Sequence, residues 1–269
     1  VSRAFYIART GRPGPVVLDF PKSAQVQKCE WRPAKVESVR SYEPYPKIDM
    51  TRVEEAAALI NSAERPLALV GHGVELAGAQ RELAEFLERA DIPAARTLLG
   101  LSALPTDHPL NVGMLGMHGN LAPNVNTQKA DVIIAIGMRF SDRDTGRLDT
   151  YAKQAKIIHL DIDRVEIDKI VKTDVAVVGD CKESLPAMTR LLRKADHREW
   201  RDSFKPYWEE ETRRVIEPAI HPKEGPLLMG EIVNAVAEAT DGEAVLVNDV
   251  GQNQMFSCRY FKYPKKRSV

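Results

Sequence analysis

Short apolar runs alternate along the chain with segments of helical period. The two clearest runs, at residues 132–136 and 156–160, are rich in Ile, and charged residues follow each of them at once. Strands of a parallel sheet are covered on both faces, so they read as continuous apolar runs with charges beyond their ends. We therefore predict that both runs are buried strands of a parallel sheet.

The whole pattern predicts about six strands with helices between them. The strands are expected at residues 16–20, 66–70, 92–97, 132–136, 156–160 and 175–178, with a further short strand at 244–247. The helices are expected at residues 2–10, 51–60, 76–90, 181–193, 228–237 and 253–261. Thr51 is expected to cap the second helix, with Glu54 completing a capping box. This alternation predicts the α/β class: a doubly wound, Rossmann-like parallel sheet with partial flanking domains.

Proline-rich segments without a clear period divide this pattern. We predict the tail of one domain at residues 1–25, a linker at 26–49, a central domain at 50–195, a second linker at 196–225 and the start of another domain at 226–269. The opening residues read as a helix entered midway, and the chain ends where a strand could begin. We therefore expect an internal piece of a longer protein.

Composition argues against several classes of function. The chain has 269 residues with 38 basic and 38 acidic side chains, so its charge gives no reason to expect nucleic acid or a membrane as a partner. No apolar run approaches the roughly 18 residues of a membrane helix. Cys29, Cys181 and Cys258 are widely spaced, which favours a reducing compartment: the cytoplasm of a bacterium, or an organelle of a eukaryote.

Two glycine-rich segments are candidates for contact with a nucleotide. Gly71 and Gly73 flank His72 between a predicted strand and a predicted helix, where glycine lets the backbone approach a phosphate or a ribose. The next glycine is Gly78, so the three-glycine fingerprint is incomplete, and an ordinary tight turn explains the pair equally well. Residues 113–119 suit either a loop that wraps a flat ring or a surface loop, and composition alone favours the surface loop.

Charged residues at the predicted strand ends are the next candidates. Arg139, Asp142 and Arg143 suit either a pyrophosphate clamp or a surface ion cluster.

A second group alternates along one strand. His159, Asp161 and Asp163 share one face, and they suit either a carboxylate that holds ribose hydroxyls or a set of metal ligands. No Cys or second His joins them, which favours the ribose. Asp180, next to Gly179, is likewise an acidic residue at the end of a predicted strand. No nucleophile–base pair stands out, so these residues predict a nucleotide site but identify no reaction.

Six segments of the chain together resemble a known family. They are GRPGPVVLDFPK (11–22), GMLGMHG (113–119), GMRFSDRDTG (137–146), KIIHLDIDRVEI (156–167), VVGDCKESL (177–185) and NDVGQNQMF (248–256). In this order they are similar to the catalytic large subunit of acetohydroxyacid synthase, also called acetolactate synthase, among the thiamine-diphosphate-dependent enzymes. The resemblance covers nearly the whole chain.

The resemblance implies a function and its cofactors. The family condenses two 2-oxo acids, pyruvate with pyruvate or with 2-oxobutyrate, with decarboxylation, in branched-chain amino acid biosynthesis. Residues 50–195 are then an FAD-binding domain, residues 1–25 end a pyrimidine-binding domain, and residues 226–269 open the domain that binds the pyrophosphate of thiamine. Thiamine diphosphate and Mg²⁺ are expected only in the full-length protein. That protein is expected to be a homodimer or homotetramer with a regulatory small subunit.

The resemblance also implies the site residues. The expected cofactor-binding residues are Arg12, Gly71, Gly73, Thr97, Leu98, Leu115, Gly116, Met117, His118, Gly137, Arg139, Arg143, Asp161, Ile162, Glu166, Gly179, Asp180, Val250, Gly251 and Gln252. Met117, Asp142 and Arg143 are expected at the substrate channel. The family's thiamine-activating glutamate and its metal-binding motif fall outside the chain. No catalytic residue and no metal ligand is therefore expected, and the piece is expected to be inactive alone.

Other interpretations remain open. The chain is compatible with another thiamine-diphosphate carboligase or oxidase, such as glyoxylate carboligase or pyruvate oxidase, and with a stand-alone flavin- or NAD-binding module. Some positions depart from the family's usual residues: His72 replaces glycine, Ser141 replaces aspartate, and Asp144 replaces valine. Asn253 and Phe256 depart in the same way.

Overall fold

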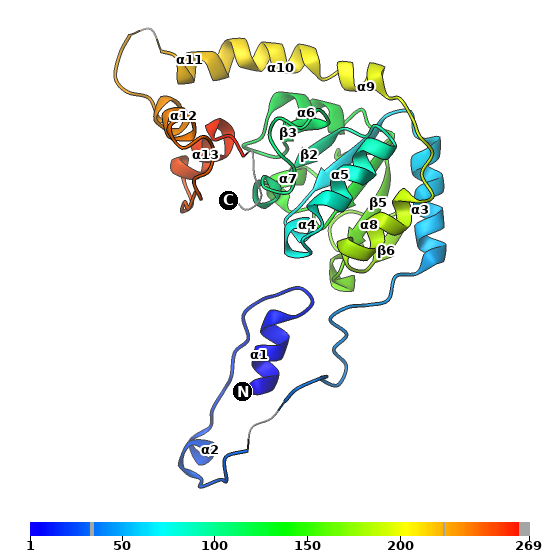
Figure 1. Cartoon of the computed structure of the whole chain (residues 1–269), viewed down its shortest axis with the longest axis vertical. Coiled ribbons are helices and arrows are strands. Elements are labelled where there is room, and N and C mark those ends of the chain that lie inside the picture. Colours follow the sequence, from blue (N-terminus) through cyan, green and yellow to red (C-terminus); the bar gives the residue numbers. More distant parts are fainter. Residues whose placement is uncertain (33–34, 223, 264–269) are drawn as a thin grey trace. The chain divides into compact units, whose positions relative to one another are not determined.

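The chain divides into two compact units, Val1–Lys47 and Ile48–Val269. The computed structural model describes residues 1–32, 35–222 and 224–263. In the first unit, α1 (Ser2–Arg9) and α2 (Lys22–Val26) are joined by chain without regular structure. The second unit holds the sheet and the candidate site (Figure 1).

The second unit is built on a six-stranded sheet. Its strands are β1 (Pro66–Val70), β2 (Ala94–Arg96), β3 (Asn111–Met114), β4 (Val132–Ile136), β5 (Lys156–Asp161) and β6 (Val175–Val178). Their order is β3-β2-β1-β4-β5-β6, and every neighbouring pair is parallel. This is the strand order of a doubly wound, Rossmann-type sheet, so the predicted fold class is confirmed.

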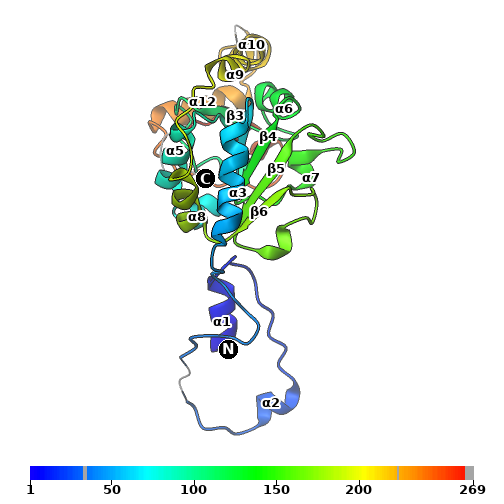
Figure 2. The same cartoon turned by 90° about the vertical axis from the view of Figure 1, so that its right-hand side faces the viewer.

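Helices cover both faces of the sheet (Figure 2). On one face, α3 (Met50–Ser62), α5 (Gln80–Arg89) and α8 (Cys181–Thr189) pack in one hydrophobic core. On the other face, α6 (Leu121–Thr127), α9 (Arg198–Asp202) and α10 (Lys205–Glu211) contribute to a second core. The remaining elements are α4 (Gly73–Leu76), η1 (Leu98–Gly100), α7 (Asp142–Thr145), η2 (Arg164–Glu166), η3 (Thr212–Ile216), α11 (Glu217–Ile220), α12 (Met229–Ala239) and α13 (Gln252–Tyr260).

Alternate residues of the central strands face the two cores. In β1, Leu67 and Leu69 lie in one cluster and Ala68 and Val70 in the other, and none of the four is exposed. Side chains of a strand point alternately to its two faces. Because both faces of the sheet are covered here, each of these positions is apolar, which is why the central strand sequences read as continuous runs.

Two predicted strands belong to no sheet. Residues 16–20 are irregular, with Val17 92% exposed, and residues 244–247 are irregular, with Val247 88% exposed. A strand needs a second strand to pair with its backbone groups, and the part of the chain that the structure describes pairs none with either segment. The sixth strand is instead β3, whose sequence NVGM contains Asn and Gly and does not read as a β-branched run. The predicted number of strands in the sheet was right, and one predicted member was wrong.

The predicted helix starts also need correction. Asp49, not Thr51, is the N-cap of α3, and its carboxylate accepts a hydrogen bond from the Thr51 backbone N–H at 2.9 Å. Aspartate is the stronger capping residue, so the helix begins one residue earlier than predicted. The helix predicted at residues 76–90 begins only at Gln80, as α5, because the chain turns at Gly78 with φ +62°, and Leu76 instead ends the short helix α4.

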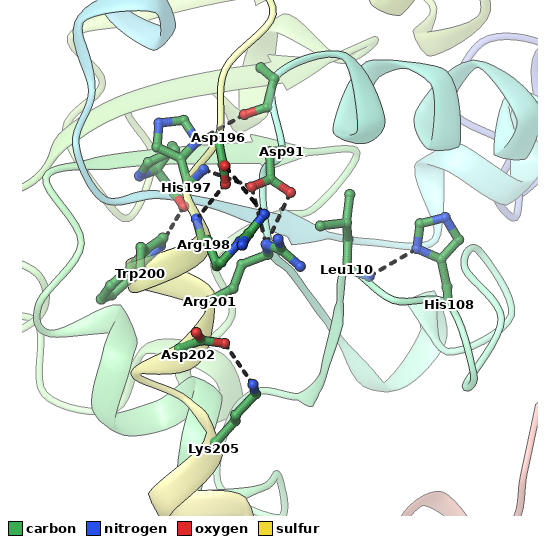
Figure 3. A network of polar contacts seen from close by, with 12 residues as sticks. Asp91, His108, Leu110, Asp196, His197, Arg198, Trp200, Arg201, Asp202 and Lys205 are labelled. Carbon is green, nitrogen blue, oxygen red and sulfur yellow. Dashed lines mark hydrogen bonds and ion pairs between the residues drawn. The ribbon is translucent and has the colours of Figure 1, made fainter.

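The predicted second linker, residues 196–225, is largely helical, and its first turns are anchored to the sheet (Figure 3). Asp91 accepts hydrogen bonds from the His197 backbone N–H at 2.6 Å and from Arg201 Nε at 3.1 Å. The Trp200 indole is buried and donates to the Pro66 carbonyl at 2.8 Å, where β1 begins. This segment is therefore part of the central unit.

An ion pair between α5 and α8, in which Glu82 is buried and Lys182 is half exposed, makes the stability of this unit depend on pH. Lys182 Nζ lies 2.8 Å from Glu82 Oε2, and the Glu82 side chain is 4% exposed. The hydrogen bond from Lys182 lowers the pKa of Glu82 from 4.5 to about 2. A carboxyl with a depressed pKa stabilises the fold above its unfolded pKa, and this contribution is lost as the pH falls from about 4.5 to about 2.

We expect Lys182→Met to lower the free energy of unfolding at neutral pH and to make it less dependent on pH below about 4.5. Urea unfolding at pH 7 and pH 3 measures this. The matched control is Lys205→Met, which removes an exposed pair with Asp202 and should change little. If Lys182→Met leaves the difference between the two pH values unchanged, Lys182 does not hold Glu82 in its ionised form.

Candidate nucleotide-binding site

The order in which the chain adds strands to the sheet reverses between β1 and β4. From β1 the chain proceeds outward to β2 and β3, and from β4 it proceeds outward on the other side to β5 and β6. In open α/β sheets, ligands bind outside the carboxyl ends of the strands, at this reversal. The segments that follow β1 and β4 therefore mark the centre of the candidate site.

Three glycines bring these two segments into contact. The Gly71 N–H donates to the Ile136 carbonyl at 2.9 Å, and the Gly73 N–H donates to the Gly137 carbonyl at 3.0 Å. A Cβ on Gly71 would lie 2.2 Å from the Gly137 oxygen, and a Cβ on Gly73 would lie 2.7 Å from the Gly137 Cα. Gly137 itself has φ +58°, which favours glycine. The glycines are thus required by close backbone packing, whether or not a ligand lies above them.

Similar hydrogen bonds join the other strand ends. The Thr97 N–H donates to Val70 at 2.9 Å, the Leu115 N–H to Arg96 at 3.0 Å, the Gly137 N–H to Leu160 at 2.8 Å and the Gly179 N–H to Asp161 at 3.0 Å. The segments after all six strands therefore start side by side along one edge. The predicted residues that end or follow the strands at this edge are Gly71, Gly73, Thr97, Leu98, Leu115, Gly116, Met117, His118, Gly137, Arg139, Arg143, Asp161, Ile162, Glu166, Gly179 and Asp180.

The glycine-rich segment 113–119 is a strand end followed by a hydrogen-bonded turn. Gly113 and Met114 belong to β3, which corrects the prediction of a loop throughout. Asn124 brackets Gly116: its side chain accepts from the Gly116 N–H and donates to the Gly116 carbonyl, both at 2.8 Å. The Met117 N–H donates to the Arg143 carbonyl at 2.7 Å, and the Met117 side chain is exposed. The turn therefore contacts the segment after β4.

The two candidate arginines lie in that segment and are exposed. Arg143 Nη1 donates to Asp142 Oδ2 at 2.8 Å, in a pair that solvent can reach. Ser141 donates to Asp144 at 3.0 Å, and burial raises the pKa of Asp144. Both guanidinium groups are accessible to an anion. The structure also permits the surface-cluster interpretation, because the pair of Asp142 and Arg143 is complete in itself.

The metal site considered as an alternative for His159, Asp161 and Asp163 does not form. His159 is fully buried, and its Nε2 donates to the Met138 carbonyl at 2.8 Å. Burial also lowers the pKa of His159, so the ring is neutral and structural. Asp163 caps η2 through the Val165 N–H at 3.0 Å. Among the described residues there is no cluster of three or more His, Cys, Asp or Glu suited to a metal.

The remaining acids at the edge already have structural roles. Asp161 accepts from the Asp163 N–H at 2.8 Å, and Asp180 caps α8 by accepting from the Lys182 N–H at 2.8 Å. Glu166 is buried and lies 2.9 Å from Lys169 Nζ. A carboxylate has two oxygens with about four acceptor positions, so a structural role does not by itself prevent an acid from also accepting a bond from a ligand.

Two parts of the predicted site do not follow strands of the sheet. Arg12 belongs to the separate unit Val1–Lys47. Val250, Gly251 and Gln252 form the turn that opens α13, with Gly251 as N-cap at φ +138°. Neither part belongs to the sheet edge, and both assignments stay predictions.

One residue of this edge was not predicted. Glu75 of α4 is buried, two residues after Gly73, and its Oε2 has no hydrogen-bond partner among the described residues. His72 Nδ1 is 3.9 Å from that oxygen and lies 3.0 Å from the Leu99 carbonyl. The sequence signal for Glu75 was an acidic residue in the first turn after a Gly-x-Gly segment.

A comparison of the chain with known families agrees with this geometry. The sequence pattern of the central domain of thiamine pyrophosphate enzymes matches residues 53–188. That span contains all six strands and the segments that follow them. The chain belongs to the thiamine pyrophosphate enzyme family.

Individual members of the family are similar over nearly the whole chain. The chain is 40% identical to the acetolactate synthase isozyme 1 large subunit of Escherichia coli (strain K12), over 99% of this chain and 46% of that protein. It is 38% identical to the probable acetolactate synthase large subunit of Methanocaldococcus jannaschii, over 98% and 46%. It is 34% identical to the acetolactate synthase large subunit of Lactococcus lactis, over 100% and 46%. The predicted resemblance is confirmed, and the chain spans about half the length of these relatives.

Within the described ranges, no helix is both long and apolar enough to cross a membrane.

The glycine contact at the reversal gives a direct test. We expect Gly71→Ala to lower the free energy of unfolding by about 1–3 kcal/mol, because the new Cβ must displace the Gly137 carbonyl. Chemical denaturation measures the change. Gly14→Ala is the control, since a Cβ there meets open space. Equal stability of both variants would show that the segments after β1 and β4 are not in contact.

Proposed function

We propose that the carboxyl edge of the sheet binds FAD, and that the chain is the FAD-binding part of an acetolactate synthase large subunit. One observation carries this proposal: apart from Arg12, the residues assigned to FAD by sequence resemblance end or follow six different strands, at the edge where this fold class binds nucleotides.

The residues present fit such a ligand. Gly71, Gly73 and Gly116 carry no side chain that would block a close approach of the cofactor. The His72 ring between the first two is held 3.0 Å from the Leu99 carbonyl, and the exposed Met117 supplies an apolar surface. Arg139 and Arg143 carry the accessible positive charge that a diphosphate needs.

The adenosine end would lie at the opposite part of the edge. Asp161 ends β5, Glu166 follows it and Asp180 follows β6, and a carboxylate is a suitable acceptor for ribose hydroxyls. Ile162 and Gly179 would flank them. Arg12, from the other unit, is proposed as a further contact.

The sequence resemblance extends the proposal to the whole protein. The full-length enzyme would condense pyruvate with pyruvate or 2-oxobutyrate, with thiamine diphosphate and Mg²⁺, in the cytoplasm or an organelle. Its partners would be a second large subunit and a regulatory small subunit. The relatives' names support this extension. In this family the flavin is not an electron carrier in the condensation, so flavin binding is the property to measure for this chain. The 269 residues alone are expected to supply binding without turnover.

An activity assay tests the extension to the whole protein. The full-length gene product that contains this chain should form acetolactate from pyruvate when thiamine diphosphate and Mg²⁺ are present. Reaction of glyoxylate instead, or consumption of oxygen with pyruvate, would point to glyoxylate carboligase or pyruvate oxidase and refute the proposal.

A pair of arginine variants tests the flavin site itself. We expect Arg143→Ala to weaken FAD binding by about 1–3 kcal/mol, roughly five- to 150-fold in Kd, because the diphosphate loses a charged partner. Equilibrium dialysis followed by flavin absorbance measures this. Arg147→Ala is the control, since Arg147 is also exposed and paired with an acid, Asp149, as Arg143 is with Asp142, but it is not among the residues assigned to the cofactor. If the two variants bind FAD equally well, Arg143 does not contact the cofactor.

A further inference from the structure

A buried ion pair connects two helices that are distant in sequence. Glu211 ends α10, and its side chain is only 2% exposed. Its Oε1 accepts from Arg259 Nη2 of α13, whose side chain is 23% exposed. Its Oε2 accepts from the Leu121 backbone N–H at 2.9 Å, at the start of α6. One carboxylate therefore joins α6, α10 and α13.

The pair is sensitive to the loss of either partner. Removing one member of a buried ion pair leaves the other charge desolvated and unpaired, which is far more costly than losing an exposed pair. The Arg259 Nε is also buried, and it has no hydrogen-bond partner among the described residues. Arg259 therefore depends on Glu211 for the pairing of its charge.

Helix α6 in turn holds the glycine turn of the candidate site. Asn120, its N-cap, accepts from the Met114 N–H at 2.9 Å, at the end of β3. Asn124, one turn later, brackets Gly116 with two hydrogen bonds of 2.8 Å. The Met117 N–H then reaches the Arg143 carbonyl at 2.7 Å. A continuous series of hydrogen bonds thus runs from α13, through Glu211 and α6, to the turn and to the segment after β4.

Apolar packing follows the same route independently. Met114 and Leu101 share a buried cluster with Cys258, Phe261 and Tyr263, at the end of α13 and just beyond it. The Thr106 N–H donates to the Tyr263 carbonyl at 3.0 Å, and the Tyr263 N–H donates to Thr106 Oγ1 at 2.9 Å. The segment after α13 is therefore fixed against the β2–β3 side of the edge.

We propose that Glu211 and Arg259 are positioning residues, which set the turn at residues 115–119 by anchoring α6 to α13. The docked C-terminal helix thereby shapes the β3 side of the carboxyl edge. The consequence for the flavin rests on the proposed function; the position of the turn does not.

Hydrogen exchange on the 269-residue chain tests the positioning. Glu211→Gln keeps an acceptor for Leu121 but places an amide donor against the Arg259 guanidinium. We expect exchange of the amides at residues 115–121 to accelerate about fivefold or more, with the amides of β4 and β5 unchanged. Arg259→Met should act in the same way, and Arg259→Lys, which keeps the charge, should restore most of the protection. The matched control is Glu210→Gln, which removes only the exposed pairs with Arg213 and Arg214.

The same variants are then measured for FAD binding. Glu211→Gln and Arg259→Met should raise the Kd for FAD, and the double variant should show less than the sum of the two effects, because both act through one contact. Unchanged exchange at residues 115–121, or acceleration equal to that of β4 and β5, overturns the positioning role. Accelerated exchange with an unchanged Kd overturns its link to the flavin. Failure of the unaltered chain to bind FAD instead overturns the proposed function, and the exchange data still decide the role of Glu211.

Discussion

The contact between Gly71, Gly73 and Gly137 is the constraint on which the rest of the site depends. It lies where the strand order of the sheet reverses, and it lets two backbone segments approach to a distance at which a Cβ would clash. Without that approach, the segments after β1 and β4 would separate and the row of strand ends would open. The close packing of the two segments therefore requires the three glycines even when no ligand is bound. The ligand site is a consequence of the same geometry.

The central part of this fold could be predicted from sequence, and its periphery could not. β1, β4 and β5 are buried on both faces, so burial accounts for their apolar runs, while β6 at the edge of the sheet buries only Val175 and Val177. β3 is short, and Gly113 lies where a side chain would meet Trp208 and Asn120, so packing that is remote in sequence removes the strand signal. Residues 16–20 have a strand-like sequence but no partner strand within the described chain, and periodicity carries no information about partners.

The candidate site shows the same division. Residues that follow strands could be predicted, because the chain order fixes the edge at which they lie. The capping roles of Asp163 and Asp180 are local, yet they become clear only once the helix starts are known. Nothing in the sequence pattern indicated the roles of Asn124 and Glu211. Glu211 contacts residues 90 and 48 positions away, and a charged residue late in a polar helix reads as solvated.

The two halves of the edge are supported in different ways. In the half formed by β1, β4, β5 and β6, the strand-end segments are held by backbone hydrogen bonds and by short caps within the central unit. At β2 and β3, backbone hydrogen bonds from Thr97 and Leu115 are joined by further support from α6, and through it from Glu211, Arg259 and the packing around Tyr263. Under the proposed function, the adenosine end of the cofactor would then lie on the self-supporting half and the flavin on the dependent half. Docking of the C-terminal helix would therefore affect the environment of the flavin ring more than retention of the nucleotide.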